Sequence, residues 1–188
     1  MTKVLLHCCC APCSVSAINP LKDEGFTPVA FWYNPNIHPF KEYEARRDCL
    51  IEYAKQNELE TKVLEDYGLR SFVKNVADNI ENRCKYCYEH RLEQTAKYAA
   101  ENGYKYFTST LLASLYQDHE AIKNAGVRYA EKYGIEFLYR DFRPNFRNGN
   151  QTAREIGLYM QKYCGCIFSE EDRYSKQIER DKIKFNSV

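Results

Sequence analysis

The chain has 188 residues, of which 44% are apolar, and a formal net charge of +1. This length and apolar content suit one domain with one hydrophobic core, so we expect residues 1–188 to form a single domain. The sequence opens without a charged and then apolar signal segment, and no apolar run reaches the roughly 18 residues of a membrane span, which predicts a cytoplasmic protein without a membrane partner.

Strands and helices alternate along the sequence. Residues 3–8 predict a short buried strand, Ser14 is expected to cap a helix that Gly25 closes, and residues 27–33 predict the next strand. The following elements are then expected: helix 40–57, strand 61–64, helix 69–80, a helix from about 86 to 102, strand 104–109, helix 118–133, strand 135–139 and an exposed helix after Ser169. This alternation predicts a parallel sheet with helices on both faces.

The carboxyl ends of the strands are the expected location of the functional site, because ligands of such sheets bind there. A run of cysteines begins where the first strand should end, and residues 109–112 leave the carboxyl end of the fourth strand. A phosphate-binding loop would need glycines at this first turn, and LHCCCAPCS has none. The sequence therefore predicts a thiol site at this edge of the sheet.

Apart from Cys49, the cysteines fall into three groups, in LHCCCAPCS, NRCKYCY and KYCGCIFS. In a reducing compartment, clustered cysteines are typically metal ligands or catalytic thiols. Cys9 and Cys10 can hold one metal centre only where the backbone turns, and Cys84 and Cys87 are spaced to face one side of a helix start. Four such thiolates can hold either zinc or an iron-sulfur cluster.

The pair Cys164 and Cys166, separated by a glycine, is a different kind of group. It can close a small strained disulfide of the redox-active type, or it can be two buried cysteines under the last helix. We interpret Cys8 and Cys49 as ordinary buried cysteines. Cys13 either faces the site as a spare ligand or packs in the first helical turn.

Arginines concentrate between residues 140 and 154. Residues 140–154 contain only one acidic residue, Asp141, beside the arginines Arg140, Arg143, Arg147 and Arg154. This stretch is either a phosphate-contacting surface or a solvated loop.

Long motifs around these residues resemble the QueH-type epoxyqueuosine reductases. The resemblance extends from Leu6 to Ser169, with Leu115 as a small departure where the family more often has proline. It rests on LHCCCAPCS, YNPNIHPFKEYEARR, NRCKYCYEHRLEQTA, FTSTLLASLYQDHEAIK and YRDFRPNFRNGNQTAREIGLYMQKYCGCIFS.

The resemblance implies an activity, a fold and a set of cofactor ligands. The activity is reduction of the epoxide of epoxyqueuosine, at the wobble position of tRNA, to queuosine, without cobalamin. The fold would resemble the adenine-nucleotide α-hydrolases, with helical additions that carry the cysteine clusters. A 4Fe-4S cluster would be bound by Cys9, Cys10, Cys84 and Cys87, with a redox-active pair at Cys164 and Cys166.

The reaction needs two electrons and two protons, whereas a cluster transfers one electron at a time. We therefore interpret Cys164 and Cys166 either as a second electron reservoir or, with Cys13, as ligands of an additional iron. An external electron donor is required. Asp141 and Tyr116 are the candidate proton donors, since each lies in a motif just after a predicted strand.

A wobble base can be splayed into a pocket, stacked on aromatic rings and held by phosphate contacts. The candidate contacts are Tyr33, Tyr116, Tyr139, Arg140, Arg143 and Arg147, whereas His38 is interpreted as a hydrogen-bonded loop histidine. Two alternatives to the reductase remain: a zinc-stabilised RNA-binding domain without catalysis, and a thiol oxidoreductase without iron.

Overall fold

The structure is a computed structural model that describes residues 2–186. Its centre is a five-stranded parallel sheet in the order β3-β2-β1-β4-β5. The strands are β1 (Thr2–His7), β2 (Phe26–Trp32), β3 (Thr61–Val63), β4 (Tyr106–Ser109) and β5 (Glu136–Phe137). The winding direction reverses between β1 and β4, so the crevice for a ligand is expected beyond their carboxyl ends.

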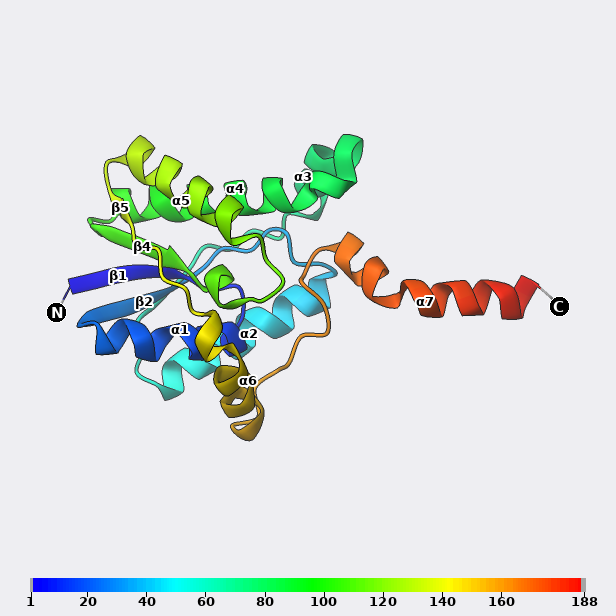
Figure 1. The fold of residues 1–188 in the computed structure, drawn as a ribbon, viewed down its shortest axis with the longest axis horizontal. Helices are drawn as coiled ribbons and strands as arrows, with labels where there is room; N and C mark the ends of the chain where they lie inside the picture. The colour runs from blue at the N-terminus through cyan, green and yellow to red at the C-terminus, as the bar shows by residue number, and fades with distance from the viewer. Residues whose placement is uncertain (1, 187–188) are drawn as a thin grey trace.

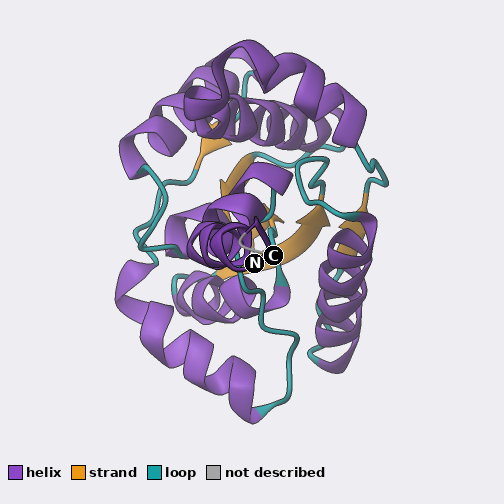
Figure 2. Ribbon diagram, turned by 90° about the vertical axis from the view of Figure 1, so that its right-hand side faces the viewer, coloured by secondary structure: helices purple, strands orange, loops and turns teal. Residues whose placement is uncertain are grey.

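Helices cover both faces of this sheet (Figures 1 and 2). Helices α4 and α5 pack against each other on one face, and α1, α2 and α6 lie on the other. The central strands are continuously apolar and buried, as parallel strands between two helical layers must be; Leu5, Phe31 and Phe107 have no exposed surface. The helices are α1 (Ala11–Asp23), α2 (Phe40–Gln56), α3 (Leu69–Val76), α4 (Arg83–Glu101), α5 (His119–Tyr133), α6 (Phe146–Glu155) and α7 (Ile167–Asn186), with 3-10 helices η1 (Ala77–Asn82), η2 (Thr110–Ala113) and η3 (Arg143–Asn145).

The first helix begins four residues earlier than predicted, so the expectation that Ser14 caps it is wrong. Cys10 is the N-cap, and Pro12 in the first turn favours this start because its missing N–H needs no partner there. The Ser14 hydroxyl instead donates to the Cys10 carbonyl within the helix, at 2.9 Å. As a result, Cys13 lies in the first turn of α1 and moves with Cys10.

Other elements also differ from the sequence prediction: α3 ends at Val76 rather than Ile80, and β4 and β5 are shorter than predicted. Helix α4 starts at Arg83, so Cys84 and Cys87 lie in its first turns. Part of the arginine-rich stretch forms α6 rather than a loop, and α6 approaches α1 so closely that a Cβ atom at Gly149 would lie 2.1 Å from the Ser16 Oγ atom.

Helix α7 extends away from the carboxyl edge of the sheet (Figure 1). It has no buried residue, which confirms the exposed helix predicted after Ser169. Across residues 2–186, we find no helix whose length and apolar content would let it cross a membrane.

Candidate metal and thiol site

Three cysteines converge just after β1, and we call Cys9, Cys10 and Cys13 the strand-end group. Their sulfur atoms lie within 4.8 Å of one another. The hydroxyl of Thr110, at the carboxyl end of β4, accepts from the Cys9 amide at 3.0 Å and donates to the Cys9 sulfur at 3.3 Å. The predicted meeting of the cysteine run with residues 109–112 is therefore confirmed.

The thiols of the strand-end group are hydrogen-bonded to one another. Hydrogen bonds from Cys10, Cys13 and Thr110 hold the pKa of Cys9 well below its usual range, against the effect of burial. The pKa of Cys13 is raised because its own proton is engaged by Cys10 and Cys9. Cys9 is therefore the cysteine of this group whose thiolate form is most favoured, and the thiolate is the form that binds a metal.

Four other cysteines line a neighbouring cavity of about 220 Å³. We call Cys84, Cys87, Cys164 and Cys166 the cavity group. Cys87 and Cys166 are buried, whereas Cys84 and Cys164 are exposed. Burial raises the pKa of Cys87 to about 12. The cavity group therefore surrounds a space that a substrate or cofactor can enter, with two thiols facing solvent.

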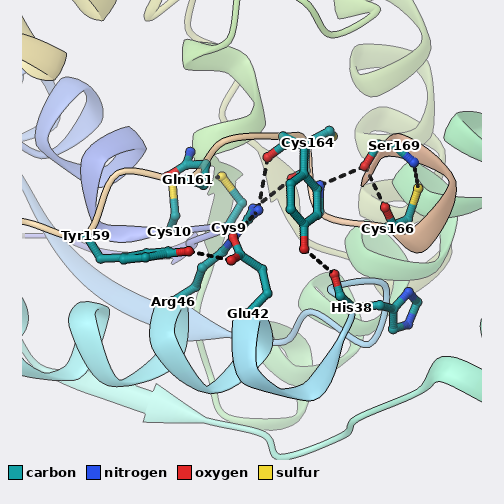
Figure 3. A network of polar contacts seen from close by, with 12 residues as sticks. Cys9, Cys10, His38, Glu42, Arg46, Tyr159, Gln161, Cys164, Cys166 and Ser169 are labelled. Carbon is teal, nitrogen blue, oxygen red and sulfur yellow. Dashed lines mark hydrogen bonds and ion pairs between the residues drawn. The ribbon is translucent and has the colours of Figure 1, made fainter. Parts of the chain in front are cut away.

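The turn that carries Cys164 and Cys166 is held by a buried arginine (Figure 3). Arg46 donates to the carbonyls of Cys164 at 2.7 Å and Tyr163 at 3.0 Å, and it forms an ion pair with Glu42 at 2.7 Å. Its side chain is only 1% exposed. Arg46 was not a predicted site residue, because nothing in its local sequence indicates that it reaches a turn 118 positions away.

The same terminal segment also contacts the strand-end group. The Gln161 amide donates to the Cys10 sulfur at 3.1 Å, three residues before Cys164 (Figure 3). The two thiol groups are therefore connected through one stretch of chain.

A second buried arginine contacts the cavity group from α4. The Arg91 guanidinium donates to the Cys87 sulfur at 3.0 Å. Its positive charge also lowers the pKa of Cys9, after the hydrogen bonds that Cys9 accepts. Sequence reasoning missed Arg91, although its spacing of four from Cys87 puts both on one face of a helix.

The candidate proton donors lie in different surroundings. Tyr116 lines the cavity and is 86% exposed. Asp141 does not line it; its carboxylate pairs with Arg143 at 2.7 Å, and that contact lowers its pKa.

The predicted RNA contacts are also spread out. Tyr33 is 5% exposed and its hydroxyl bonds the His90 ring at 2.9 Å, so it is packed rather than available for stacking. Arg140 is paired with Glu24 at 2.7 Å, while Arg147 lies on α6. The ring of Tyr139 lies beneath the Lys123 ammonium.

Of the residues interpreted as structural, Cys8 and His38 are buried, whereas Cys49 is half-buried rather than buried as predicted. The Cys8 thiol is buried and donates to the Leu6 carbonyl, and the Cys49 sulfur accepts from the Tyr159 amide. His38 is buried, with one ring nitrogen 3.1 Å from the Pro35 carbonyl oxygen. None of the three lines the cavity.

A thiol-rich site beyond the carboxyl ends of a parallel sheet in this strand order defines a candidate metal or redox protein of the adenine-nucleotide α-hydrolase-like fold. Solved structures support the fold. The U34-tRNA thiolase NcsA from Methanococcus maripaludis with its [4Fe-4S] cluster aligns with a TM-score of 0.58 and 13% identity, covering 98% of this chain and 67% of that one. A predicted subunit of tRNA methyltransferase from Methanocaldococcus jannaschii aligns with a TM-score of 0.52 and 17% identity, covering 82% and 77%.

Sequence comparison identifies the family within this fold. The family model for epoxyqueuosine reductase QueH matches residues 4–172. Curated proteins named epoxyqueuosine reductase QueH are 37% identical in Dehalococcoides mccartyi, over 93% of this chain and 96% of that protein, and 37% identical in Thermotoga maritima, over 95% and 96%. The chain therefore belongs to the QueH family.

Proposed function

We propose that this protein is an epoxyqueuosine reductase, which reduces the epoxide of epoxyqueuosine at the tRNA wobble position to give queuosine. Beyond family membership, one observation carries the proposal. Seven cysteines from three distant parts of the sequence gather at the carboxyl edge of the sheet, beside a cavity of about 220 Å³. Exposed Tyr116 lines this cavity, and a cavity of this size suits an extruded base.

The donor set fits an iron-sulfur cluster. Cysteine thiolates are the usual ligands of such clusters; Cys9 and Cys10 lie close together in the strand-end group, and Cys84 and Cys87 line the neighbouring cavity. We propose that Cys9, Cys10, Cys84 and Cys87 bind a 4Fe-4S cluster and that Cys13 is available for an additional iron. Cobalamin has no part in this proposal. When bound, the cluster would supply electrons one at a time.

The two electrons and two protons that the epoxide consumes are assigned to the protein's own thiols. Opening the epoxide to an alkene consumes two electrons and two protons and releases the oxygen as water. Oxidation of Cys164 and Cys166 from two thiols to one disulfide provides two electrons and two protons, so the two half-reactions balance. Both cysteines are free thiols in the structure, and an external donor would reduce them again after each turnover.

Proton delivery to the leaving oxygen is proposed for Tyr116 rather than Asp141. Tyr116 lines the cavity, whereas Asp141 is ionised and engaged by Arg143. The Tyr116 ring packs edge-on against Phe146 of α6, with ring centroids 6.5 Å apart. Arg147 is the next residue of α6, and we propose that it contacts the tRNA.

The proposal is tested by purifying the protein without oxygen and measuring iron, sulfide, zinc and turnover together. We expect a brown protein with iron and sulfide, which removes one oxygen atom from epoxyqueuosine in tRNA, as detected by mass spectrometry. A colourless protein with stoichiometric zinc and no turnover would support the alternative, a zinc-stabilised RNA-binding domain. Turnover that persists after complete iron removal would instead support an iron-free thiol oxidoreductase.

A further inference from the structure

Arg91 is a buried cation without a carboxylate. The residue is 3% exposed, and residues 2–186 provide no acidic side chain within ion-pair distance of its guanidinium. The other buried arginine of the site, Arg46, has Glu42 at 2.7 Å. A buried charge without a partner costs several kcal/mol, so the location of Arg91 requires a source of negative charge.

Among residues 2–186, the cysteine sulfurs are the main groups near Arg91 that can carry that negative charge. One guanidinium nitrogen donates to the Cys87 sulfur at 3.0 Å, and a second donates to the Asn34 side-chain oxygen at 3.4 Å. Burial lowers the pKa of Arg91, and the groups that offset this effect are Cys87, then Cys9, then Cys164, and last Tyr88. These cysteines come from both thiol groups, so Arg91 lies within the electrostatic reach of each.

The contacts also fix the orientation of the guanidinium. Arg91 follows Cys87 by one helical turn on α4, and its Nε atom donates to the Cys87 carbonyl at 3.3 Å. The Asn34 amide donates to the Cys8 carbonyl at 2.9 Å, next to the strand-end group. The guanidinium is therefore held from both sides of the site, which gives its charge a defined position.

We propose that Arg91 is a positioning residue that supplies the fixed positive charge for the thiolate-bound cluster and raises its reduction potential. This inference rests on the proposed function, since it requires the cluster. Reduction adds negative charge to a cluster, and a nearby buried cation stabilises the reduced form more than the oxidised form. A hydrogen bond to a ligand sulfur acts in the same direction. Loss of Arg91 must then lower the potential.

The test compares the midpoint potential of the cluster in Arg91→Gln, Arg91→Lys and a control. Lys97→Gln is the matched control, because it removes a positive charge from the solvent-exposed side of the same helix. Each protein is loaded anaerobically, its iron and sulfide are measured, and its potential is determined by a redox titration followed by electron paramagnetic resonance. We expect a lower potential in Arg91→Gln, a smaller decrease in Arg91→Lys, which keeps the charge but not the planar fork, and no change in Lys97→Gln.

Equal potentials in the wild type and Arg91→Gln, at equal iron and sulfide content, would overturn the inference and leave the proposed function intact. A wild-type protein that takes up no iron would overturn the proposed function, and this inference with it. If Arg91→Gln does not fold, Arg91→Lys decides, because a lysine ammonium cannot keep the charge in the position that the three guanidinium contacts define: a lower potential supports the inference and an unchanged potential overturns it. If Arg91 had a purely structural role, its replacement would reduce the stability of the protein and leave the potential of the cluster unchanged.

Discussion

The strand-end group and the cavity group contain the same side chain but are built differently. Cys9, Cys10 and Cys13 are placed by one continuous turn between β1 and α1, with their sulfurs within 4.8 Å of one another. The cavity group joins the start of α4 to a turn more than 70 residues later in the sequence, and side chains such as Arg46 hold that turn in place. One group is set by the backbone, and the other depends on tertiary contacts.

This difference suggests a division of labour. A group that is formed by the backbone and enclosed is suited to hold a cofactor permanently, because few of its atoms must move to bind a metal. The cavity group combines both roles: Cys84 and Cys87 would complete the cluster, and its terminal pair, exposed Cys164 and buried Cys166, is suited to react with a substrate and with an electron donor. Its turn contains Gly165 at a φ of +154°, a backbone conformation that residues with a Cβ atom rarely adopt.

The largest expected effect concerns the cluster ligands. Replacing Cys9, Cys10, Cys84 or Cys87 singly by serine should remove most of the bound iron and sulfide and abolish turnover, because each variant loses one thiolate ligand. Iron and sulfide assays on anaerobically purified protein measure this, and Cys49→Ser is the control with an unaffected site. If all four variants retained full iron and sulfide, this ligand assignment would be wrong.

A second large effect separates the two functions that we assign to cysteine. Cys164→Ser and Cys166→Ser should keep the cluster and lose epoxide reduction, since a single thiol cannot supply two electrons by closing a disulfide. Mass spectrometry of the modified nucleoside and iron analysis are performed on the same preparation. Wild-type rates in both variants would contradict the redox pair, whereas loss of one iron per chain in these variants and in Cys13→Ser would indicate an additional iron site.

A moderate effect is expected from the contacts that hold the cavity turn. Arg46→Met should lower the free energy of unfolding of the metal-free protein by about 3–5 kcal/mol, because it leaves the carboxylate of Glu42 and two carbonyls without their buried partner. Chemical denaturation measures this difference. Arg47→Met, whose ion pairs are more exposed, should cost less than about 1 kcal/mol, and equal costs for both variants would show that the turn does not depend on Arg46.

The contrast between the two thiol groups also explains what the sequence could predict. Apolar patterning predicted the parallel sheet, and adjacent motifs predicted that the cysteine run meets the residues after β4, because both depend on neighbouring residues and on the strand order. The contributions of Arg46 and Arg91 could not be predicted in this way. Each is a charged side chain within an amphipathic helix, and only the folded arrangement shows that it is buried against thiols and carbonyls rather than exposed to solvent.

The smallest expected effect concerns the tRNA surface. The logarithm of the tRNA-binding constant falls linearly with the logarithm of the salt concentration. We expect Arg147→Ala to reduce the magnitude of this slope by roughly 0.7–0.9, which corresponds to the loss of one phosphate contact. Arg147 lies on α6 beside Phe146, which packs against Tyr116 at the cavity. Arg140 and Arg143 are engaged by Glu24 and Asp141, so their alanine variants should change the slope much less.

Affinity measurements across a salt series, with equal cluster content in every variant, distinguish these arginines. A decrease for Arg147→Ala alone would place the tRNA backbone along α6, next to the cavity group. Equal decreases for all three variants would mean that the ion pairs of Arg140 and Arg143 open when tRNA binds. An unchanged slope in a variant with Arg140, Arg143 and Arg147 all replaced by alanine would exclude this face as the RNA surface. The exposed basic residues of α7 would then be the next to test, because that helix begins at the rim of the same cavity.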